Sequence, residues 1–321
     1  MSVLAKHLIS DGWRRTSMVF TWLVIALLWP LHHASVLADE SEAVQASDTI
    51  VLGRVSNNPR KHYAALDALG NYLVQHSDDF VRHETRLAKD NHEMIELLRA
   101  GKIDLVSETA FSAIQYERLA DAEILLRQWK GGQASYKTVF FARKDSDIQR
   151  LQDLAGHLIA FEDSGSTSGY FVPKATIANL GMPLKFAEKP RGTTDVGYLF
   201  ADSEVNVVAW VARDKVDVGV TSNLHWNDTS RAPLGLKRQL RIFHTTPDII
   251  RSVMIAGPRL NEVQRDSITR TLLSMHESDG GQVALEAFYK TTRFDSLVDD
   301  AKDSLDHVRA LYDHLGDTPP L

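Results

Sequence analysis

The sequence contains no cysteine among its 321 residues. Disulfide bonds are therefore excluded, and so is a lipid-modified cysteine at the end of an export signal. The 13 histidines show no spacing typical of a structural zinc site, and HEMIE (92–96) lacks the second histidine of a zinc-protease helix. We therefore predict that the protein holds no metal and no other cofactor.

An excess of positive charge is missing as well. Lysine and arginine number 36 against 42 aspartates and glutamates, which gives a net charge of −6. Composition therefore offers no support for nucleic-acid binding, and we expect none. A small anion can still bind, because its capture depends on local hydrogen-bond donors and not on net charge. The chain is long enough for roughly two domains.

Long apolar runs are absent except near the N-terminus. There, Lys6 and Arg14 precede an apolar stretch over 18–31, which is followed by small residues ending in VLA (36–38). This pattern predicts that residues 1–38 are a cleaved export signal and that the mature protein lies in the periplasm. The stretch is shorter than the roughly 20 residues of a membrane span, although an uncleaved anchor is the alternative.

Predicted strands and helices alternate along the chain in two stretches. TIVLGRV (49–55) and IDLVSET (103–109) are predicted strands, and each precedes a segment with helical periodicity. The same order returns around LIAFED (158–163) and KVDVGVTSN (215–223). This alternation predicts an α/β fold with mostly parallel sheets flanked by helices. The remainder, 260–315, is expected to be mainly helical.

Extended segments near 136–144 and 240–256 join the two stretches. We therefore expect two lobes connected by two crossovers, lobe 1 comprising 45–140 plus 245–321 and lobe 2 comprising 141–244. Ligands of open α/β sheets bind beyond the carboxyl ends of the strands. A ligand is thus expected in the cleft between the lobes, which would close over it by a hinge.

The run DSGSTSGY (163–170) stands where a predicted strand passes into a predicted helix. The first N–H groups of a helix have no intrahelical acceptor, and the helix dipole favours negative charge there. Hydroxyl groups add donors, and glycine lets the backbone approach a ligand closely. The residues that combine these properties are Ser166, Thr167, Ser168 and Gly169. The run therefore predicts an anion-binding turn.

Three other interpretations of this run were compared with anion binding. A nucleophile elbow requires G-x-S-x-G, but GSTSG (165–169) places Thr167 at the centre, so a hydrolase using Thr167 is an unfavoured alternative. A phosphate loop of nucleotide hydrolases requires a lysine that is absent here. A simple helix N-cap needs only one such hydroxyl residue. Anion binding accounts better for three in a row, and we expect no enzymatic activity.

The segment YKTVFF…IANLG (136–181) resembles the PhnD-like family of ABC-transporter substrate-binding proteins for phosphonate, phosphite and phosphate. The resemblance is carried by the Tyr136 strand with KDS (144–146), by DLAG (153–156) and by STSGYFVP (166–173). DLVSETAFSAI (104–114) and DKVDVGVTSN (214–223) fit as well. It implies a two-lobed type II periplasmic-binding-protein fold and a small oxyanion as ligand. It also implies a monomer whose partner is a membrane permease, with a membrane sensor as the alternative.

The resemblance also implies roles for individual residues. Ser166, Thr167 and Ser168 would donate to the phospho oxygens, and Tyr136 would add a phenolic donor. Glu204 stands where related proteins place a histidine, and as a carboxylate it would repel a dianion unless it accepts a proton or binds a cationic group. This leaves the ligand open. The further candidates for the cleft are Asn91, Glu108, Thr109, Glu204 and Asn223.

Overall fold

The computed structural model describes residues 48–315, apart from 57, 59, 61 and 187–193. The predicted export signal lies outside this part of the chain. Among the described residues, none of the helices has both the length and the apolar character needed to cross a membrane.

The first lobe is built on a six-stranded sheet with the order β14-β4-β13-β3-β1-β2. Strands β1, β2 and β3 are parallel, whereas β13 runs antiparallel between β3 and β4. The carboxyl ends of β1, β3 and β4 therefore lie at one edge of the sheet. The strands are β1 (Thr49–Val55), β2 (Arg82–Ala88), β3 (Leu105–Glu108), β4 (Glu123–Lys130), β13 (Val253–Ala256) and β14 (Thr291–Ser296).

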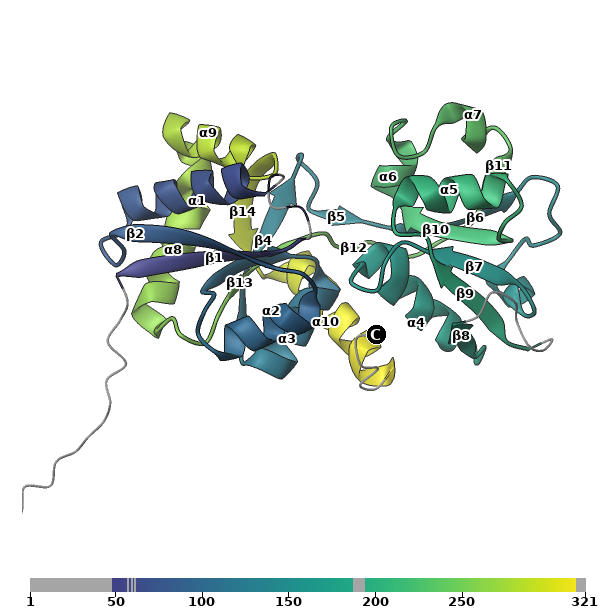
Figure 1. The fold of residues 1–321 in the computed structure, drawn as a ribbon, viewed down its shortest axis with the longest axis horizontal. Coiled ribbons are helices and arrows are strands. Elements are labelled where there is room, and N and C mark those ends of the chain that lie inside the picture. Colours follow the sequence, from purple (N-terminus) through teal and green to yellow (C-terminus); the bar gives the residue numbers. More distant parts are fainter. Residues whose placement is uncertain (1–47, 57, 59, 61, 187–193, 316–321) are drawn as a thin grey trace, which may run out of the picture. The chain divides into compact units, whose positions relative to one another are not determined.

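Helices cover both faces of this sheet (Figure 1). One core, which includes Leu52 and Leu69, lies between the sheet and α1, α8 and α9. The other, which includes Ile114 and Val308, lies under α2, α3 and α10. The helices are α1 (Tyr63–His76), α2 (Asn91–Arg99), α3 (Ala110–Ala120), α8 (Glu262–Ser274), η4 (Met275–Glu277), α9 (Asp279–Ala287) and α10 (Asp299–Leu315).

The second lobe has its own six-stranded sheet with the order β11-β6-β10-β7-β9-β8. Phe141 and Val207 belong to the core on the side of α5, and Phe161 and Ile177 to the core on the side of α4. The strands are β6 (Thr138–Arg143), β7 (Leu158–Phe161), β8 (Leu184–Phe186), β9 (Val196–Phe200), β10 (Val218–Ser222) and β11 (Leu240–Thr245). The helices are η2 (Leu151–Leu154), η3 (Thr167–Phe171), α4 (Val172–Ala178), α5 (Glu204–Ala212), α6 (Asn223–Asn227) and α7 (Leu234–Lys237).

The chain passes between the lobes twice, through β5 (Ser135–Tyr136) and β12 (Ile249–Ile250). These two short strands pair antiparallel, with Ile249 opposite Tyr136, and form a two-stranded ribbon. The α/β fold with a flanked sheet in each lobe and two crossovers confirms the predicted fold class. The lobe boundaries at 141 and 244 stay a prediction.

Two sequence expectations differ from the structure. The region expected to be mainly helical contains β14, an edge strand that pairs antiparallel with β4. Its alternation is weak, because only Thr291 and Phe294 are buried, and its pairing partner lies more than 150 residues away in sequence. The extended segment near 136–144 is interrupted at Lys137, because β5 belongs to the crossover ribbon and β6 to the second lobe.

A buried ion pair fixes the amino-terminal edge of the first sheet, opposite the edge that faces the second lobe. Asp104 is 0% exposed and accepts hydrogen bonds from the backbone N–H of Val51 (2.7 Å) and from Nε of Arg259 (2.7 Å). It therefore connects β1, β3 and the segment after β13. A buried carboxylate that loses its cation is strongly destabilising.

We expect Arg259→Met to lower the free energy of unfolding by about 3–5 kcal/mol, because Asp104 would remain buried without its cation. Urea unfolding followed by circular dichroism measures this loss. The matched control is Arg118→Met, which breaks the exposed pair with Asp313 (3.2 Å) and should cost less than about 1 kcal/mol. Equal losses in the two variants would contradict the structural role of Asp104.

Candidate anion-binding site

The predicted anion-binding turn lies where β7 ends and a helical segment begins. Its first turn, η3, is π-helical and continues directly into α4. Ser166 is the N-cap, and its Oγ accepts a hydrogen bond from the N–H of Gly169 (3.0 Å). The N–H groups of Thr167 and Ser168 begin the helix and have no intrahelical acceptor. The turn therefore carries backbone donors where the second lobe contacts the first.

Tyr136, on the crossover strand β5, supplies a hydroxyl beside this turn. The residue is 6% exposed, and its Oη has no hydrogen-bond partner among the described residues. Burial raises the pKa of Tyr136 to about 12, while the nearby hydroxyls of Ser168 and Thr167 act against the rise without completing a bond to Oη in this structure. A buried donor of this kind is costly unless an acceptor meets it. Tyr136 is therefore a neutral donor that a ligand can satisfy.

Thr167 joins the turn to the first lobe. Its Oγ1 accepts a hydrogen bond from the backbone N–H of Phe111 (3.0 Å), and the rings of Phe111 and Phe171 stack with centroids 4.1 Å apart. Thr109 is the N-cap residue of α3, but its side chain makes no capping bond. The N-terminus of α3 thus meets the N-terminus of the 167–178 helical segment. Among the described residues Thr167 Oγ1 accepts one hydrogen bond and donates none, so its own hydrogen can bond a ligand.

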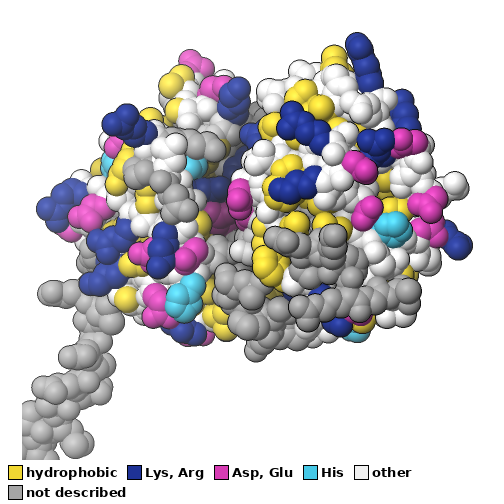
Figure 2. All heavy atoms as spheres, turned by 45° about the vertical axis from the view of Figure 1, so that its right-hand side comes forward, with side chains coloured by type: hydrophobic (Ala, Val, Ile, Leu, Met, Phe, Trp, Pro, Cys, Tyr) yellow, Lys and Arg dark blue, Asp and Glu magenta, His cyan; other side chains and the backbone are white. Residues whose placement is uncertain are grey.

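A cavity of about 790 Å³ opens between the first lobe and the start of the turn. Figure 2 shows the surface hollowed between the lobes, with acidic and basic side chains in the hollow. Asn91 lines the cavity, but its side chain is already bonded by Ser112 (2.9 Å), Gln115 (3.0 Å) and Tyr116 (2.7 Å). The lining residues from the two lobes include Arg54, Asn91, Glu108, Ser112, Asp163 and Gly165.

Glu108 and Asn223, two of the predicted cleft residues, also bond to the protein. Glu108 is buried at the end of β3 and pairs with Arg54 (3.2 Å). Asn223 holds the crossover, because its Oδ1 accepts from the N–H of Lys137 (2.8 Å) and its own N–H donates to the Lys137 carbonyl (2.8 Å). The structure thus brings 166–169 together with Tyr136, whereas Asn223 bonds to the backbone of the crossover.

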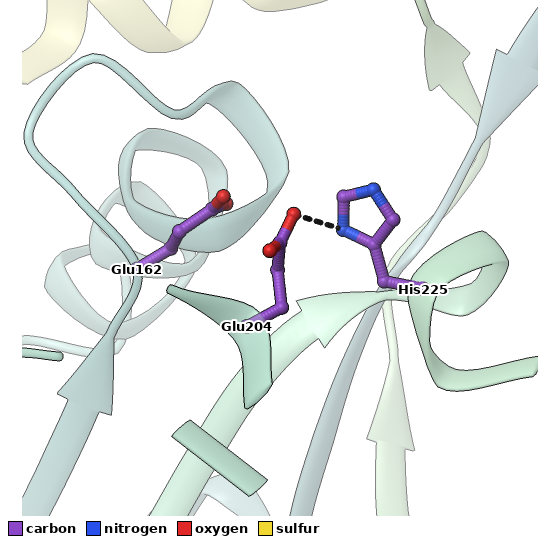
Figure 3. A group of neighbouring side chains, drawn as sticks. All are labelled: Glu162, Glu204 and His225. Carbon is purple, nitrogen blue, oxygen red and sulfur yellow. Dashed lines mark ion pairs between the residues drawn. The ribbon is translucent and has the colours of Figure 1, made fainter. Parts of the chain in front are cut away.

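Glu204 belongs to a cluster that also contains Glu162 and His225 (Figure 3). Oε1 of Glu204 lies 2.9 Å from Nδ1 of His225 and 3.0 Å from Nη1 of Arg231. Glu162 follows β7 directly, and Ser166 Oγ donates to its Oε2 (2.8 Å). The cluster therefore lies directly behind the anion-binding turn.

The two carboxylates of this cluster have opposite protonation tendencies. Burial and the charge of Glu204 raise the pKa of Glu162 to about 9. Burial alone would also raise the pKa of Glu204, but the hydrogen bond and the charge of His225 outweigh it and lower that pKa far below the usual range. The pair thus holds one proton near neutral pH, on Glu162. This protonation limits the repulsion that two carboxylates would exert on an anion in the turn.

The same three side chains are the described residues that could hold a metal ion. Their ligand atoms all lie within 4.8 Å of one another. However, Glu204 already bonds His225 and Arg231, and a metal would have to displace the proton of Glu162. Sequence reasoning named Glu204 but missed Glu162 and His225. Glu162 could have been found from its position immediately before the predicted turn at 163–170.

Comparison with known proteins agrees with this architecture. The family described as the periplasmic substrate-binding protein of phosphonate ABC transporters matches residues 55–301. The phosphate-import protein PhnD of Mycolicibacterium smegmatis is 26% identical over 178 residues. That alignment covers 54% of this chain and 54% of the relative, so the chain is matched to about half the length of this curated protein.

Solved structures show the same fold along most of the chain. XAC2383 from Xanthomonas citri, solved bound to chloride and bound to ATP, is 32% identical with a TM-score of 0.78. Its alignment covers 84% of this chain and 100% of XAC2383. PhnD1 from Prochlorococcus marinus, in complex with methylphosphonate, is 17% identical with a TM-score of 0.60, over 84% of this chain and 98% of PhnD1. The chain therefore belongs to the family of periplasmic substrate-binding proteins of phosphonate ABC transporters.

Proposed function

We propose that this protein binds a phosphonate-, phosphite- or phosphate-like oxyanion at residues 166–169 and delivers it to a membrane permease. The observation that carries this proposal is the hydroxyl of Tyr136, a buried donor with no hydrogen-bond partner among the described residues, beside Thr167 and Ser168. Family membership and the phosphate and methylphosphonate named for PhnD and PhnD1 support the ligand class.

The electrostatics of the turn favour an anion that must be released again. Two helix N-termini meet at the contact between Phe111 and Thr167, and each carries partial positive charge. Their donors are neutral N–H and O–H groups, which bind oxyanions without the strength of a direct ion pair. Glu204 bonds His225 and Arg231, so it is less available to bind a cationic group of a ligand than the sequence suggested.

A catalytic role for Thr167 has no support in this geometry. The group bonded to its oxygen is the backbone N–H of Phe111, which cannot take a proton from the hydroxyl. Nucleophilic hydroxyls require an adjacent general base. We therefore assign Thr167 to ligand binding. Membership of a family of periplasmic substrate-binding proteins supports a location in the periplasm.

Phosphate, phosphite and methylphosphonate should raise the melting temperature, and a ligand at 100 times its Kd should stabilise the protein by about 2.7 kcal/mol. Tyr136→Phe should weaken the affinity about 10- to 100-fold, because it removes a hydrogen bond to a charged group. The stability of the ligand-free protein should not fall, since the lost hydroxyl has no partner there. Calorimetry and thermal unfolding measure both effects.

The control for this substitution is Tyr63→Phe, which removes a tyrosine hydroxyl from a half-exposed side chain of the first lobe. Its affinity should equal that of the unsubstituted protein. If none of the three anions changes the melting temperature, the proposed function is wrong. If one of them binds but Tyr136→Phe leaves its affinity unchanged, the proposed site is wrong.

Binding should also depend on the proton of Glu162. As the pH rises through about 9, the carboxyl group of Glu162 ionises. Because this group is bonded to Ser166, its negative charge would then repel an anion bound at the turn. The affinity of the unsubstituted protein should therefore fall relative to that of Glu162→Gln. The ratio of the two Kd values is the quantity to compare, because a change in the protonation of the ligand affects both proteins equally. Calorimetry at pH 7, 8 and 9.5 tests this. Glu96→Gln, at an exposed position of α2, is the control; a ratio independent of pH would exclude the role of Glu162.

A further inference from the structure

Three basic side chains lie at the edge of the first sheet that carries the strand ends. Arg54 is near the end of β1, Lys130 ends β4, and Arg251 lies between β12 and β13. Arg54 pairs with Glu108 (3.2 Å). Neither Lys130 nor Arg251 forms an ion pair with a carboxylate of the described residues, although both side chains are partly buried.

The ring of Tyr289 gathers two of these cations. Nζ of Lys130 lies 5.2 Å from the ring centroid, and the guanidinium carbon of Arg54 lies 5.4 Å from it. Arg251 joins them, because its Nη1 donates to the Lys130 carbonyl. Nε of Arg54 is buried and has no hydrogen-bond partner in the described part of the chain. The cluster therefore offers more positive charge and more donors than the protein itself uses.

Such a cluster is unfavourable when it is empty. Burial lowers the pKa of Lys130 to about 7, and the positive charges of Arg54 and Arg251 add to this shift, whereas the charge of Glu108 acts against it. Burial also lowers the pKa of Arg251. Buried charges in proteins are normally paired with an opposite charge. An anion placed among these side chains would remove the penalty that the ligand-free protein carries.

The crossover ribbon connects this cluster to the anion-binding turn. Ile249 pairs with Tyr136 in the ribbon, and the N–H of Arg251 donates to the carbonyl of Ala134 (2.9 Å). Tyr136 and Arg251 are thus diagonal neighbours on the same face, a relation in which residues typically lie about 7–8 Å apart. One ligand of moderate size can therefore contact both.

The cavity is also larger than a bare oxyanion requires. Its volume of about 790 Å³ falls among pockets that hold drug-sized ligands, about 300–1,000 Å³. It is bounded by Arg54 on one side and by residues 163–165, at the start of the turn, on the other. Arg54 belongs to the basic cluster, and 163–165 directly precede the proposed phospho site, so the cavity reaches from the start of the turn to one member of the cluster.

We propose that the natural ligand carries a second anionic group, a carboxylate or a second phosphonate or phosphate. Arg54, Lys130 and Arg251 bind this group while the phospho group occupies residues 166–169. The proposal rests on the proposed function and defines its ligand class more narrowly. Methylphosphonate has one anionic group, phosphonoacetate adds a carboxylate, and methylenediphosphonate adds a second phosphonate. Comparing the three ligands shows whether the second group is a carboxylate or a phosphonate.

Calorimetry at pH 6 should show that at least one of the two larger ligands binds about 10-fold or more tightly than methylphosphonate. The readout is the Kd of methylphosphonate divided by the Kd of the larger ligand, because this ratio measures the contribution of the second anionic group to binding. Lys130→Met should bring this ratio close to one, and Arg251→Met serves as a second variant in case the first fails to fold. Lys102→Met, at an exposed position of the same lobe, should leave the ratio unchanged.

The outcomes separate this proposal from the proposed function. If methylphosphonate binds and the ratio is near one in the unsubstituted protein, the second subsite is excluded while the proposed function stands. A high ratio that survives both Lys130→Met and Arg251→Met would place the second group elsewhere. If none of the three ligands binds, the proposed function fails as well.

The ligand-free protein offers an independent test through the titration of Lys130. Its pKa is about 7 in the folded state and about 10.4 in an unfolded chain. The unfolded state therefore binds the extra proton between these values, so stability rises with pH across this window. Lys130→Met should raise the melting temperature most at pH 6, and the gain should shrink as the pH rises from 7 to 10. A lower melting temperature at pH 6 would show that Lys130 is satisfied in the empty protein.

Discussion

The meeting of two helix N-termini at the bond between Phe111 and Thr167 is the contact on which the site depends. Each helix brings unsatisfied N–H groups and partial positive charge to the same place. Such an arrangement is unfavourable without negative charge, which the oxyanion proposed as the ligand would supply. The fold produces this contact because both helices begin at carboxyl ends of strands, α3 after β3 and the 167–178 segment after β7.

Charge balance then explains why acidic residues surround an anion site. Glu108 compensates Arg54, and Glu204 compensates His225 and Arg231, so neither carboxylate adds a free negative charge. Glu162 lies next to the turn through its bond with Ser166, and it is the carboxylate whose pKa is raised. The acidic groups around the proposed site are therefore neutral or compensated, whereas Lys130 and Arg251, which form no ion pair with a described carboxylate, lie at the strand-end edge of the first sheet.

Local patterns in the sequence predicted much of the fold, and the proposed site is centred on residues that those patterns had singled out. Hydrophobic periodicity and turn residues suffice to predict elements such as β1 and α3, and the candidate residues Ser166–Gly169 lie within one continuous segment. The edge strand β14 was missed because its stability comes from pairing with β4, far away in the chain. The cationic cluster was missed for the same reason, since Lys130 and Arg251 become neighbours only through pairing of distant segments. Strand-end positions such as Asn223 were located, but their hydrogen-bond partners could not be inferred without coordinates.

The crossover ribbon differs from the rest of the fold because it belongs to the connection between the lobes. Tyr136 lies on β5 and Arg251 follows β12, so both belong to the segments that connect the lobes. A ligand that bonds these two side chains also bonds the connection itself. Asn223 and Ser304 hold the same ribbon from the second lobe and from α10, through the N–H groups of Lys137 (2.8 Å) and Ile250 (2.6 Å). Ligand contacts and the geometry of the connection are therefore linked through a few adjacent residues. A ligand bound to these residues would change the relative stability of different lobe arrangements, and a transport partner could distinguish loaded from empty protein by that change.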